Sequence, residues 1–112
     1  MLSRKYRLSQ EKDILEVLRN GRAFYSDYFV LRILKKRVAV SRFGFVVSKK
    51  IHNKPTKRNQ PKKRMRHIIS DHMREILLKG DYLFVAKKRI LDLSYRQLEE
   101  EIVGVLKKAK VF

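Results

Sequence analysis

Cysteine is absent from this sequence, and its absence excludes several classes of protein at once. The chain can form neither a disulfide nor a zinc site built on thiolates. No apolar run approaches the roughly 18 residues needed to cross a bilayer, and no apolar segment of signal-peptide length follows the basic N-terminus. We therefore expect a protein of the reducing cytoplasm that has no membrane partner.

Acidic residues are scarce as well, and one long segment has none. The 112 residues include 29 Lys and Arg but only 11 Asp and Glu, which gives a net charge of +18. Between Asp27 and Asp71 there is no acidic residue, whereas the same stretch holds 14 Lys and Arg. Like charge at this density destabilises a compact domain unless a polyanion neutralises it. The charge pattern thus favours a nucleic-acid partner over an anionic membrane or a merely solvated surface.

Hydrophobic residues make up 44% of the chain, which is enough for the core of one small domain over residues 1–112. The order of predicted elements, α-β-β-(β)-α-β-α, indicates an α+β sandwich whose small, mostly antiparallel sheet carries helices mainly on one face. Part of the other face then stays free for a ligand. The predicted elements are a basic N-terminal arm at 1–8, helices at 9–20, 59–79 and after 94, strands at 22–26, 28–35, up to about 48 and at 81–87, and a basic loop at 49–58.

Single residues locate the ends of the predicted helices. Ser9 is expected to cap the first helix, and Ser94 with Gln97 forms a capping box for the last one. Pro61 is expected in the first turn of the long helix, where its missing N–H is tolerated, and this puts Asn59 or Arg58 near the cap. The core-facing residues predicted for the long helix are Met65, Ile68, Ile69, Met73 and Ile76.

Two glycines and one apolar stripe carry further structural expectations. Gly44 removes a side chain from one strand face, which permits close approach of another group to the backbone. Gly80 is expected to end the long helix. The stripe expected to face the core from the first helix consists of Ile14, Leu15, Val17 and Leu18.

The segment from residue 48 to residue 66 is the strongest candidate for function. A strand end leads into a basic loop and then into a basic helix N-terminus, so cationic side chains, free backbone N–H groups and the positive end of a helix dipole meet there. All three favour phosphate, and the Asn59 amide can fix a backbone or read a base edge. A solvated basic helix is the alternative, although such helices usually mix both signs of charge. The residues expected to contact RNA are Lys49, Lys50, His52, Lys57, Arg58, Asn59, Lys62, Lys63, Arg64 and Arg66.

This segment resembles the ribonuclease P protein family, whose signature is an Arg-Asn-Arg triplet with a basic cluster on the helix that follows a strand ending in Ser-Lys-Lys. Residues 43–50 read Phe-Gly-Phe-Val-Val-Ser-Lys-Lys, and residues 58–66 read Arg-Asn-Gln-Pro-Lys-Lys-Arg-Met-Arg. Gly21, residues 29–31 and the Asp81-Tyr82 pair also match in order and spacing, so the resemblance covers nearly the whole chain. Gln60 departs from the triplet and predicts the loss of one phosphate contact; Pro61 is a second departure.

The resemblance implies an endonuclease subunit that binds ribonuclease P RNA and precursor tRNA and assists removal of the 5′ leader. It implies that the RNA subunit carries the hydrolysis with Mg2+, so that the protein needs no cofactor of its own. In this family a cleft between the first helix, the sheet and the second helix holds the leader. The matching positions are Ile14, Leu18, Arg32, Val46 and Ser48. None is aromatic, but Arg32 can stack on a base or pair with phosphate, whereas Ile14 and Leu18 fit a core role equally well.

No catalytic or metal site is expected in the protein itself. The three histidines lack zinc-ligand spacing, because His67 and His72 point different ways on a helix and His52 lies in the loop. Acidic residues near the starts of two helices are explained by the helix dipole: Asp13, Glu16 and residues 99–101.

Three other functions are alternatives to this one. A ribosomal protein or general RNA chaperone would share the charge and the size. A metal-dependent nuclease acting alone would need clustered carboxylates, which the basic region lacks. A DNA-binding module would be expected to show a helix-turn-helix pattern, and the sequence has none, so no DNA partner is expected.

Overall fold

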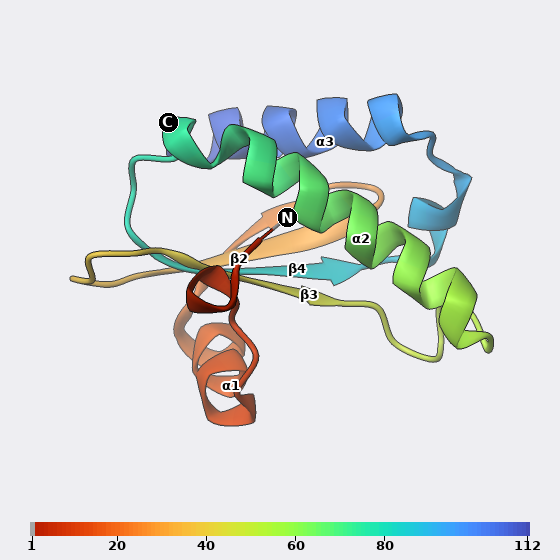
Figure 1. The fold of residues 1–112 in the computed structure, drawn as a ribbon, viewed down its shortest axis with the longest axis horizontal. Helices are drawn as coiled ribbons and strands as arrows, with labels where there is room; N and C mark the ends of the chain where they lie inside the picture. Colours follow the sequence, from red (N-terminus) through yellow and green to blue (C-terminus); the bar gives the residue numbers. More distant parts are fainter. Residues whose placement is uncertain (1) are drawn as a thin grey trace.

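The computed structural model describes residues 2–112 as a four-stranded sheet with helices on both faces (Figure 1). The strand order is β1-β2-β4-β3, in which β1–β2 and β2–β4 are antiparallel and β3–β4 is parallel. The predicted α+β class with a mostly antiparallel sheet is therefore confirmed. The elements are η1 (Arg4–Tyr6), α1 (Glu11–Asn20), β1 (Arg22–Tyr25), β2 (Phe29–Lys35), β3 (Arg42–Val46), α2 (Pro55–His72), η2 (Met73–Glu75), β4 (Gly80–Ala86), η3 (Lys88–Asp92) and α3 (Tyr95–Lys108), where η denotes a 3-10 helix.

The main core lies between one face of the sheet and the helices α2 and α3, which run over it (Figure 1). Alternation along β2 turns Phe29, Leu31 and Ile33 toward this core, and all three are buried. The ring of Phe29 packs against Phe84 of β4 at a centroid distance of 5.5 Å. Burying a side chain of this size contributes roughly 1.5–3 kcal/mol, so these rows supply much of the stability of the fold.

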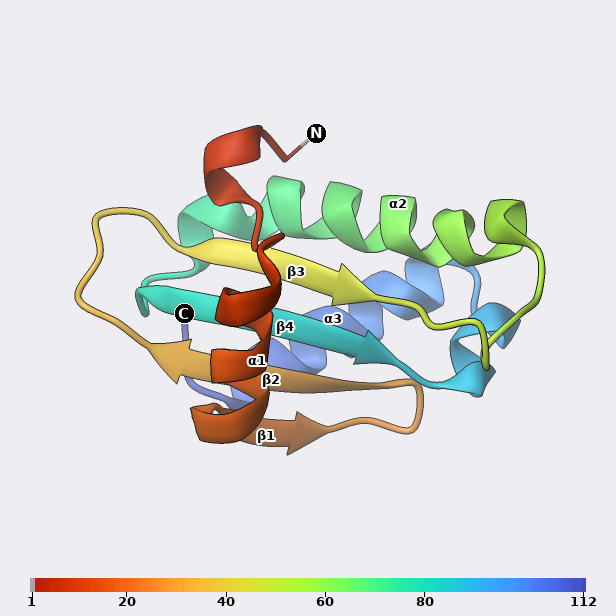
Figure 2. The same ribbon diagram turned by 90° about the horizontal axis from the view of Figure 1, so that it is seen from below.

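Helix α1 lies on the opposite face and crosses the strands near one end of the sheet (Figure 2). Its Val17 is buried against Leu8 and Leu83. Leu15 and Leu18, which the stripe prediction assigned to the core, are instead 40% and 39% exposed. The prediction of helices mainly on one face therefore holds for α2 and α3, and within residues 2–112 no helix covers the rest of the second face.

The segment predicted as a basic arm packs against the sheet from residue 2 onward, and Met1 lies outside the described residues. Leu2 and Leu8 are buried, and the Leu8 N–H donates a hydrogen bond of 2.9 Å to the Phe43 carbonyl. A Cβ on Gly44 would lie only 2.8 Å from the Leu8 carbonyl oxygen. The close approach predicted at Gly44 is thus confirmed, and the approaching group is the N-terminal segment.

The long helix begins earlier and ends earlier than predicted. It starts at Pro55, so Pro61 lies inside α2 rather than in its first turn, and Asn59 is not near the cap. Both prolines suit a first helical position, and only the earlier one occupies it. Pro61 is tolerated inside the helix because its missing hydrogen bond would have gone to the carbonyl of Lys57, an exposed residue in the first turns.

The end of α2 at His72 separates Met73 and Ile76 from the predicted helical stripe. Met73 opens η2, and the chain after η2 is held in an extended path toward β4. The N–H groups of Leu77 and Leu78 both donate to the Val111 carbonyl, at 2.7 and 3.1 Å. These two bonds to the C-terminal segment compete with helical bonds, which explains the early end of α2.

Smaller differences concern the ends of the other elements. Gly80 does not end a helix but opens β4, where a Cβ would lie 2.3 Å from the Leu34 carbonyl oxygen. Strand β3 stops at Val46, two residues before the predicted end. Helix α1 is preceded by Gln10 with no side-chain cap bond, so the prediction of Ser9 as its cap is wrong. The capping box predicted for α3 is confirmed, with both of its hydrogen bonds present.

Candidate nucleic-acid interface

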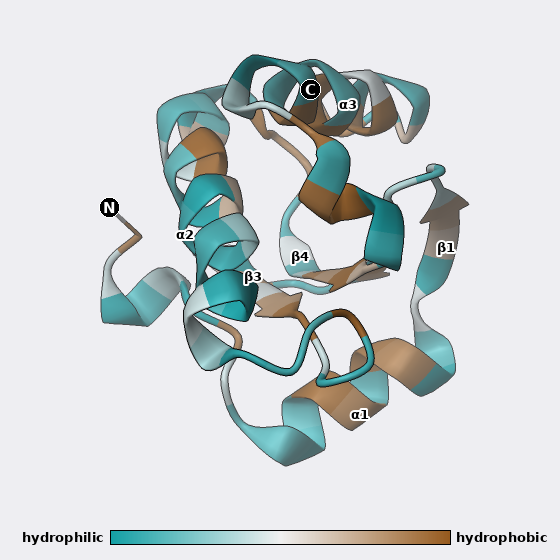
Figure 3. Ribbon diagram, turned by 90° about the vertical axis from the view of Figure 1, so that its right-hand side faces the viewer, coloured by the Kyte–Doolittle hydropathy of each residue, from teal (hydrophilic) through white to brown (hydrophobic). Residues whose placement is uncertain are grey.

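Helix α2 carries a row of cationic side chains that the protein leaves without carboxylate partners. Arg58, Lys62 and Arg66 recur every four residues and therefore lie along one line of the helix surface; we call them the basic row. In the part of the chain that the structure describes, none of the three has an acidic group within 4.0 Å. Figure 3 shows α2 as a mostly hydrophilic ribbon.

The start of α2 adds a positive electrostatic field to the basic row. No acidic residue lies in its first turn, and Lys54 at the cap forms no side-chain cap bond, so the helix dipole is not compensated there. The preceding loop is held in shape by Arg58, whose Nη1 donates to the carbonyls of His52 at 3.0 Å and Asn53 at 3.1 Å. The Lys54 N–H also donates to His52 Nδ1 at 3.0 Å. The loop is thus braced against the helix, and His52 helps to shape it.

Other predicted RNA contacts fall on a neighbouring flank of the same helix. Lys57, Asn59 and Lys63 line a shallow hollow of about 410 Å³ together with Thr56 and Gln60. We call it the basic hollow. Gln60 therefore puts a neutral amide between two lysines where the family signature has an arginine. The two loop lysines predicted to bind RNA, Lys49 and Lys50, are both exposed just before this helix.

Arg64 does not join either group. Its Nη1 donates a hydrogen bond of 3.1 Å to the carbonyl of Leu93, on the segment between η3 and α3. It thus fastens α2 to the chain that leads into α3. Helical geometry could have separated it from the basic row, because Arg64 is two residues from Lys62 and such positions do not share a face.

The residues predicted to form a cleft surround the uncovered part of the second sheet face. Val46 of β3 is paired in register with Val85 of β4, which in turn is paired with Val30 of β2. Arg32 of β2 lies on the same face in the next row. These four half-buried side chains form what we call the open face. Its floor is largely apolar, and Arg32 adds a positive charge.

Helix α1 forms one wall of the open face. Leu18 is partly exposed on this wall, and its carbonyl accepts a hydrogen bond of 3.4 Å from Arg32 Nη1. Ile14 is half-buried and packs with Val46 and Val85 around the small cluster under α1. Ser48 is exposed just beyond the end of β3. The structure thus brings Ile14, Leu18, Arg32 and Val46 together, with Ser48 at the margin.

A network of ion pairs fixes this wall to the sheet, and the sequence analysis missed it. Asp81, buried at the start of β4, accepts bonds from Arg42 Nη2 at 2.8 Å and Lys36 Nζ at 2.9 Å. Arg42 also reaches Asp13 of α1 at 3.2 Å, and Lys36 reaches Glu16 of α1 at 2.7 Å. The two acids attributed to the helix dipole are therefore ion-pair partners.

The chemistry of Asp81 follows from this network. Burial alone would raise the pKa of its carboxyl, but the hydrogen bonds from Arg42 and Lys36 outweigh burial and hold that pKa below its ordinary value. The same bonds to Asp81 raise the pKa of Arg42 against the opposing effect of burial. Asp81 and Arg42 therefore stay charged near neutral pH, and their ion pair persists.

The histidines of α2 have structural partners. His72 lies 3.0 Å from Glu75 and 3.1 Å from Glu99, while His67 lies 2.7 Å from the Tyr95 hydroxyl. Burial opposes protonation of His72, but the two carboxylates raise its pKa above the ordinary value. Glu99 therefore pairs with α2 rather than only complementing the dipole of α3. Over residues 2–112 no group of three or more His, Asp or Glu is arranged to hold a metal ion.

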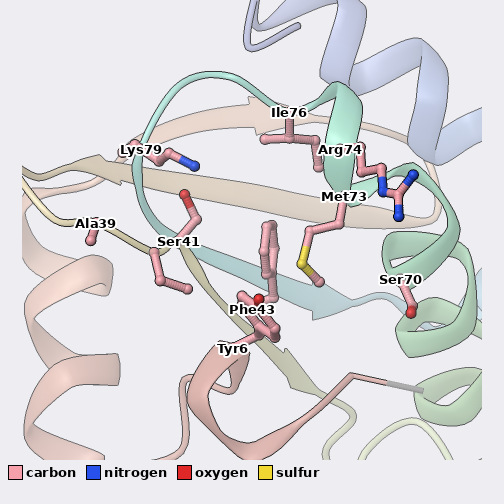
Figure 4. Close-up of a pocket in the computed structure, with 10 residues that line it drawn as sticks. Tyr6, Ala39, Ser41, Phe43, Ser70, Met73, Arg74, Ile76 and Lys79 are labelled. Atoms are coloured by element: carbon pink, nitrogen blue, oxygen red, sulfur yellow. The ribbon is translucent and has the colours of Figure 1, made fainter.

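A separate cavity of about 370 Å³ lies beside the N-terminal segment, around Tyr6, Phe43 and Met73 (Figure 4). Arg74 and Lys79 stand at its margin, and no carboxylate lines it. None of the predicted RNA contacts lines this cavity, so the candidate interface consists of the two α2 surfaces and the open face.

Among residues 2–112, no helix combines the length and the apolar character that a membrane span requires.

Comparison with known sequences points to one family. A family model described as Ribonuclease P matches residues 2–110. The ribonuclease P protein component of Streptococcus pneumoniae (strain Hungary19A-6) is 32% identical over 111 residues, covering 99% of this chain and 89% of the relative.

Comparison with solved structures agrees. The RNase P protein of Staphylococcus aureus superposes with a TM-score of 0.87 at 27% identity, covering 96% of this chain and 97% of that protein. The RNase P protein of Thermotoga maritima superposes with a TM-score of 0.80 at 27% identity, covering 91% and 96% of the two chains. The likeness therefore extends over more than nine-tenths of each chain.

Proposed function

This chain belongs to the ribonuclease P protein family and acts as the protein component of ribonuclease P, and we propose that it binds two RNAs through two different surfaces. The basic row and the basic hollow of α2 bind the RNA subunit. The open face binds the single-stranded 5′ leader of precursor tRNA. The observation that carries this proposal is the unpaired positive charge of α2 beside an uncovered, largely apolar sheet face.

The α2 surfaces suit a folded RNA because they recognise charge rather than bases. Arg58, Lys62 and Arg66 are spaced along about two helical turns, so they can contact several phosphates of one backbone. The uncompensated N-terminus of α2 supplies a further positive end for a phosphate. Asn59 in the basic hollow adds a donor and an acceptor. This set predicts tight, salt-sensitive binding with little dependence on base sequence.

The open face suits a single strand because its floor can pack against unpaired bases. Val30, Val85 and Val46 form a continuous apolar row, and Arg32 next to it can pair with a phosphate or stack on a base. A duplex would present its phosphates to this floor and leave the apolar row unused. The open face therefore favours the leader over the paired parts of the tRNA.

The proposed division of chemistry leaves hydrolysis to the RNA subunit. A magnesium ion prefers oxygen ligands, with carboxylates and phosphates foremost, and the residues of the α2 surfaces and open face are basic, amide, hydroxyl or apolar. These surfaces do not fit a Mg2+ site, whereas RNA phosphates do. The contribution of the protein is to hold the leader and to screen charge between the two RNAs. We place this activity in the cytoplasm, where bacterial tRNA is transcribed.

Reconstitution tests the proposed function directly. Precursor tRNA is incubated with the organism's ribonuclease P RNA alone, with the protein alone, and with both at low Mg2+ concentration. We expect cleavage to be fastest with both, absent with the protein alone, and accompanied by tighter binding of precursor than of mature tRNA. Leader removal by the RNA-free protein, or equal affinity for precursor and mature tRNA, would contradict the proposal.

A further inference from the structure

One aromatic side chain at the edge of the open face is largely exposed. Tyr25, the last residue of β1, is 62% exposed. It pairs in register with Val30 and so stands on the same sheet face as the open face. Within residues 2–112 its ring has neither a stacked aromatic neighbour nor a cation above it, whereas Arg22 covers Phe24 and Arg89 covers Tyr28.

The sheet register extends the apolar floor to Tyr25. The row runs from Val46 through Val85 and Val30 to Tyr25, one residue from each strand. Three strand spacings of about 4.8 Å give this row a length of roughly 14 Å. Tyr25 is the sole aromatic residue among those that the described strands turn to this face, because Phe24 points to the main core. The aliphatic residues Ile14 and Leu18 stand on the α1 wall.

The turn that follows Tyr25 is braced, so the ring stands on a fixed support. The Lys87 Nζ donates to the Ser26 carbonyl at 2.7 Å, and the Ser26 Oγ donates to Glu101 at 3.2 Å. The Ser26 Oγ also accepts the N–H of Tyr28 at 3.1 Å. Three segments thus converge on the residue next to Tyr25. The backbone next to the ring is therefore already ordered before a base packs on Tyr25, which lowers the entropy cost of binding.

We propose that Tyr25 is the stacking platform of the leader site and that one unpaired leader base packs on its ring at the β1 edge of the open face. This inference rests on the proposed function and adds a specificity-determining residue to it. The contact selects unpaired over paired nucleotides, because the face of a paired base is covered by its neighbours in the duplex. Any base can stack, so the preference among bases is modest and favours purines through their larger ring area. Only a leader long enough to cross the apolar row reaches it.

The test uses the reconstituted holoenzyme and precursor tRNAs whose leaders are shortened one nucleotide at a time. Tyr25→Ala should weaken binding of the longer leaders by about tenfold, a typical effect of removing one stacked base. It should leave the shortest leaders unaffected, and Tyr25→Phe should restore wild-type binding because the ring alone is needed. Leu77→Ala is the matched control, since Leu77 is 69% exposed on the segment between η2 and β4, away from the open face.

An abasic nucleotide moved along the leader locates the contact. One position should weaken binding to the wild type but not to Tyr25→Ala, which marks the stacked base. The chain has no Trp, so Tyr25→Trp provides a single indole whose fluorescence should change on addition of precursor but not of mature tRNA. If the wild type depends on leader length and Tyr25→Ala shows the same dependence, the inference is wrong and the proposed function stands. If the wild type shows no leader dependence, both fail.

Discussion

Lys36 and Arg42 are cationic like the residues of the basic row, but the structure gives the two groups opposite surroundings. The first two are held by three carboxylates, one of which, Asp81, is buried. The basic row has no carboxylate within 4.0 Å among the described residues. Charge that is matched inside the protein fixes α1 on the sheet, and charge that is left unmatched is available to a polyanion. Position relative to the acids, rather than residue type, separates the ion-paired Lys36 and Arg42 from the cations of the basic row.

The largest expected effect comes from removing the buried acid at the centre of the matched group. Asp81→Asn should lower the free energy of unfolding at pH 7 by about 3–5 kcal/mol, because it leaves two cations without their shared carboxylate. Chemical denaturation measures the loss, and Asp71→Asn, an exposed acid on α2 with no ion-pair partner in the described chain, is the control. The difference from wild type should shrink as pH falls through the lowered pKa of Asp81, since the wild type then loses the same charge. Equal free energies of unfolding for Asp81→Asn and the wild type at pH 7 would mean that the ion-pair network does not stabilise the fold.

Two neighbouring residues of α2 should separate stability from RNA binding. Ile69→Ala should cost roughly 2–5 kcal/mol of stability, because Ile69 is fully buried and its truncation leaves a cavity. Arg66→Ala should leave the melting temperature nearly unchanged and weaken binding of the RNA subunit by about 1–3 kcal/mol. Thermal melts and RNA titrations on both variants measure these effects. Unfolding by Arg66→Ala with normal RNA affinity per folded molecule would reverse the assignment of the two helix faces.

A smaller effect, on the salt dependence of RNA binding, should sharpen the comparison between the ion-paired cations and the basic row. The logarithm of the RNA affinity should fall linearly with the logarithm of salt concentration, and Lys62→Ala should flatten that slope by about one unit for its lost phosphate contact. Lys108→Ala, at the exposed end of α3, serves as the control and should keep the wild-type slope. A slope that Lys62→Ala leaves unchanged would show that the basic row faces away from RNA.

The smallest expected effect concerns His72, whose positive charge depends on pH and is paired with two carboxylates. The pKa of His72 is raised in the folded protein, so the stability from its charged form is fully present below about pH 6.5 and disappears as pH rises through the raised value. His72→Gln should therefore lower stability at pH 5.5 by about 0.5 kcal/mol and have less effect at pH 8.5. The control is His67→Gln, whose partner is the neutral Tyr95 hydroxyl. Equal effects of His72→Gln at the two pH values would contradict this account.

Two local signals in the sequence predicted local structure correctly, whereas the cap at Ser9 and the helix end at Gly80 were predicted wrongly. The capping box of Ser94 and Gln97 and the close approach at Gly44 are both present, because each depends on a few adjacent residues or on the lack of one side chain. The predicted start of α2 was wrong because Pro55 and Pro61 both suit a first helical turn, and the sequence alone does not distinguish between them. The strand order was not predicted, since a parallel partner for β3 depends on where the chain returns after α2.

The candidate site was predictable to the extent that it follows one helix. The spacing of Arg58, Lys62 and Arg66 was visible in the sequence, and the structure places them in one row. The ion-pair network was not visible, because Asp13 and Asp81 come together only through the fold. Tyr25 was missed for a related reason. Its place beside the open face depends on its pairing with Val30 across the sheet, and the sequence of the short β1 strand does not indicate which strand it pairs with.

The strand order has a consequence for synthesis of the chain. β4 is the last strand to be made, yet it lies between β2 and β3, which do not pair with each other. A nascent chain that has emerged only as far as Lys79 can close the β1–β2 hairpin, but β3 and the basic helix after it have no strand to join. Contacts over this sequence separation form late in folding. The basic helix α2 is therefore held in place only after residues 80–86 have left the ribosome, so a chain truncated before β4 presents its basic segment without the sheet that positions it.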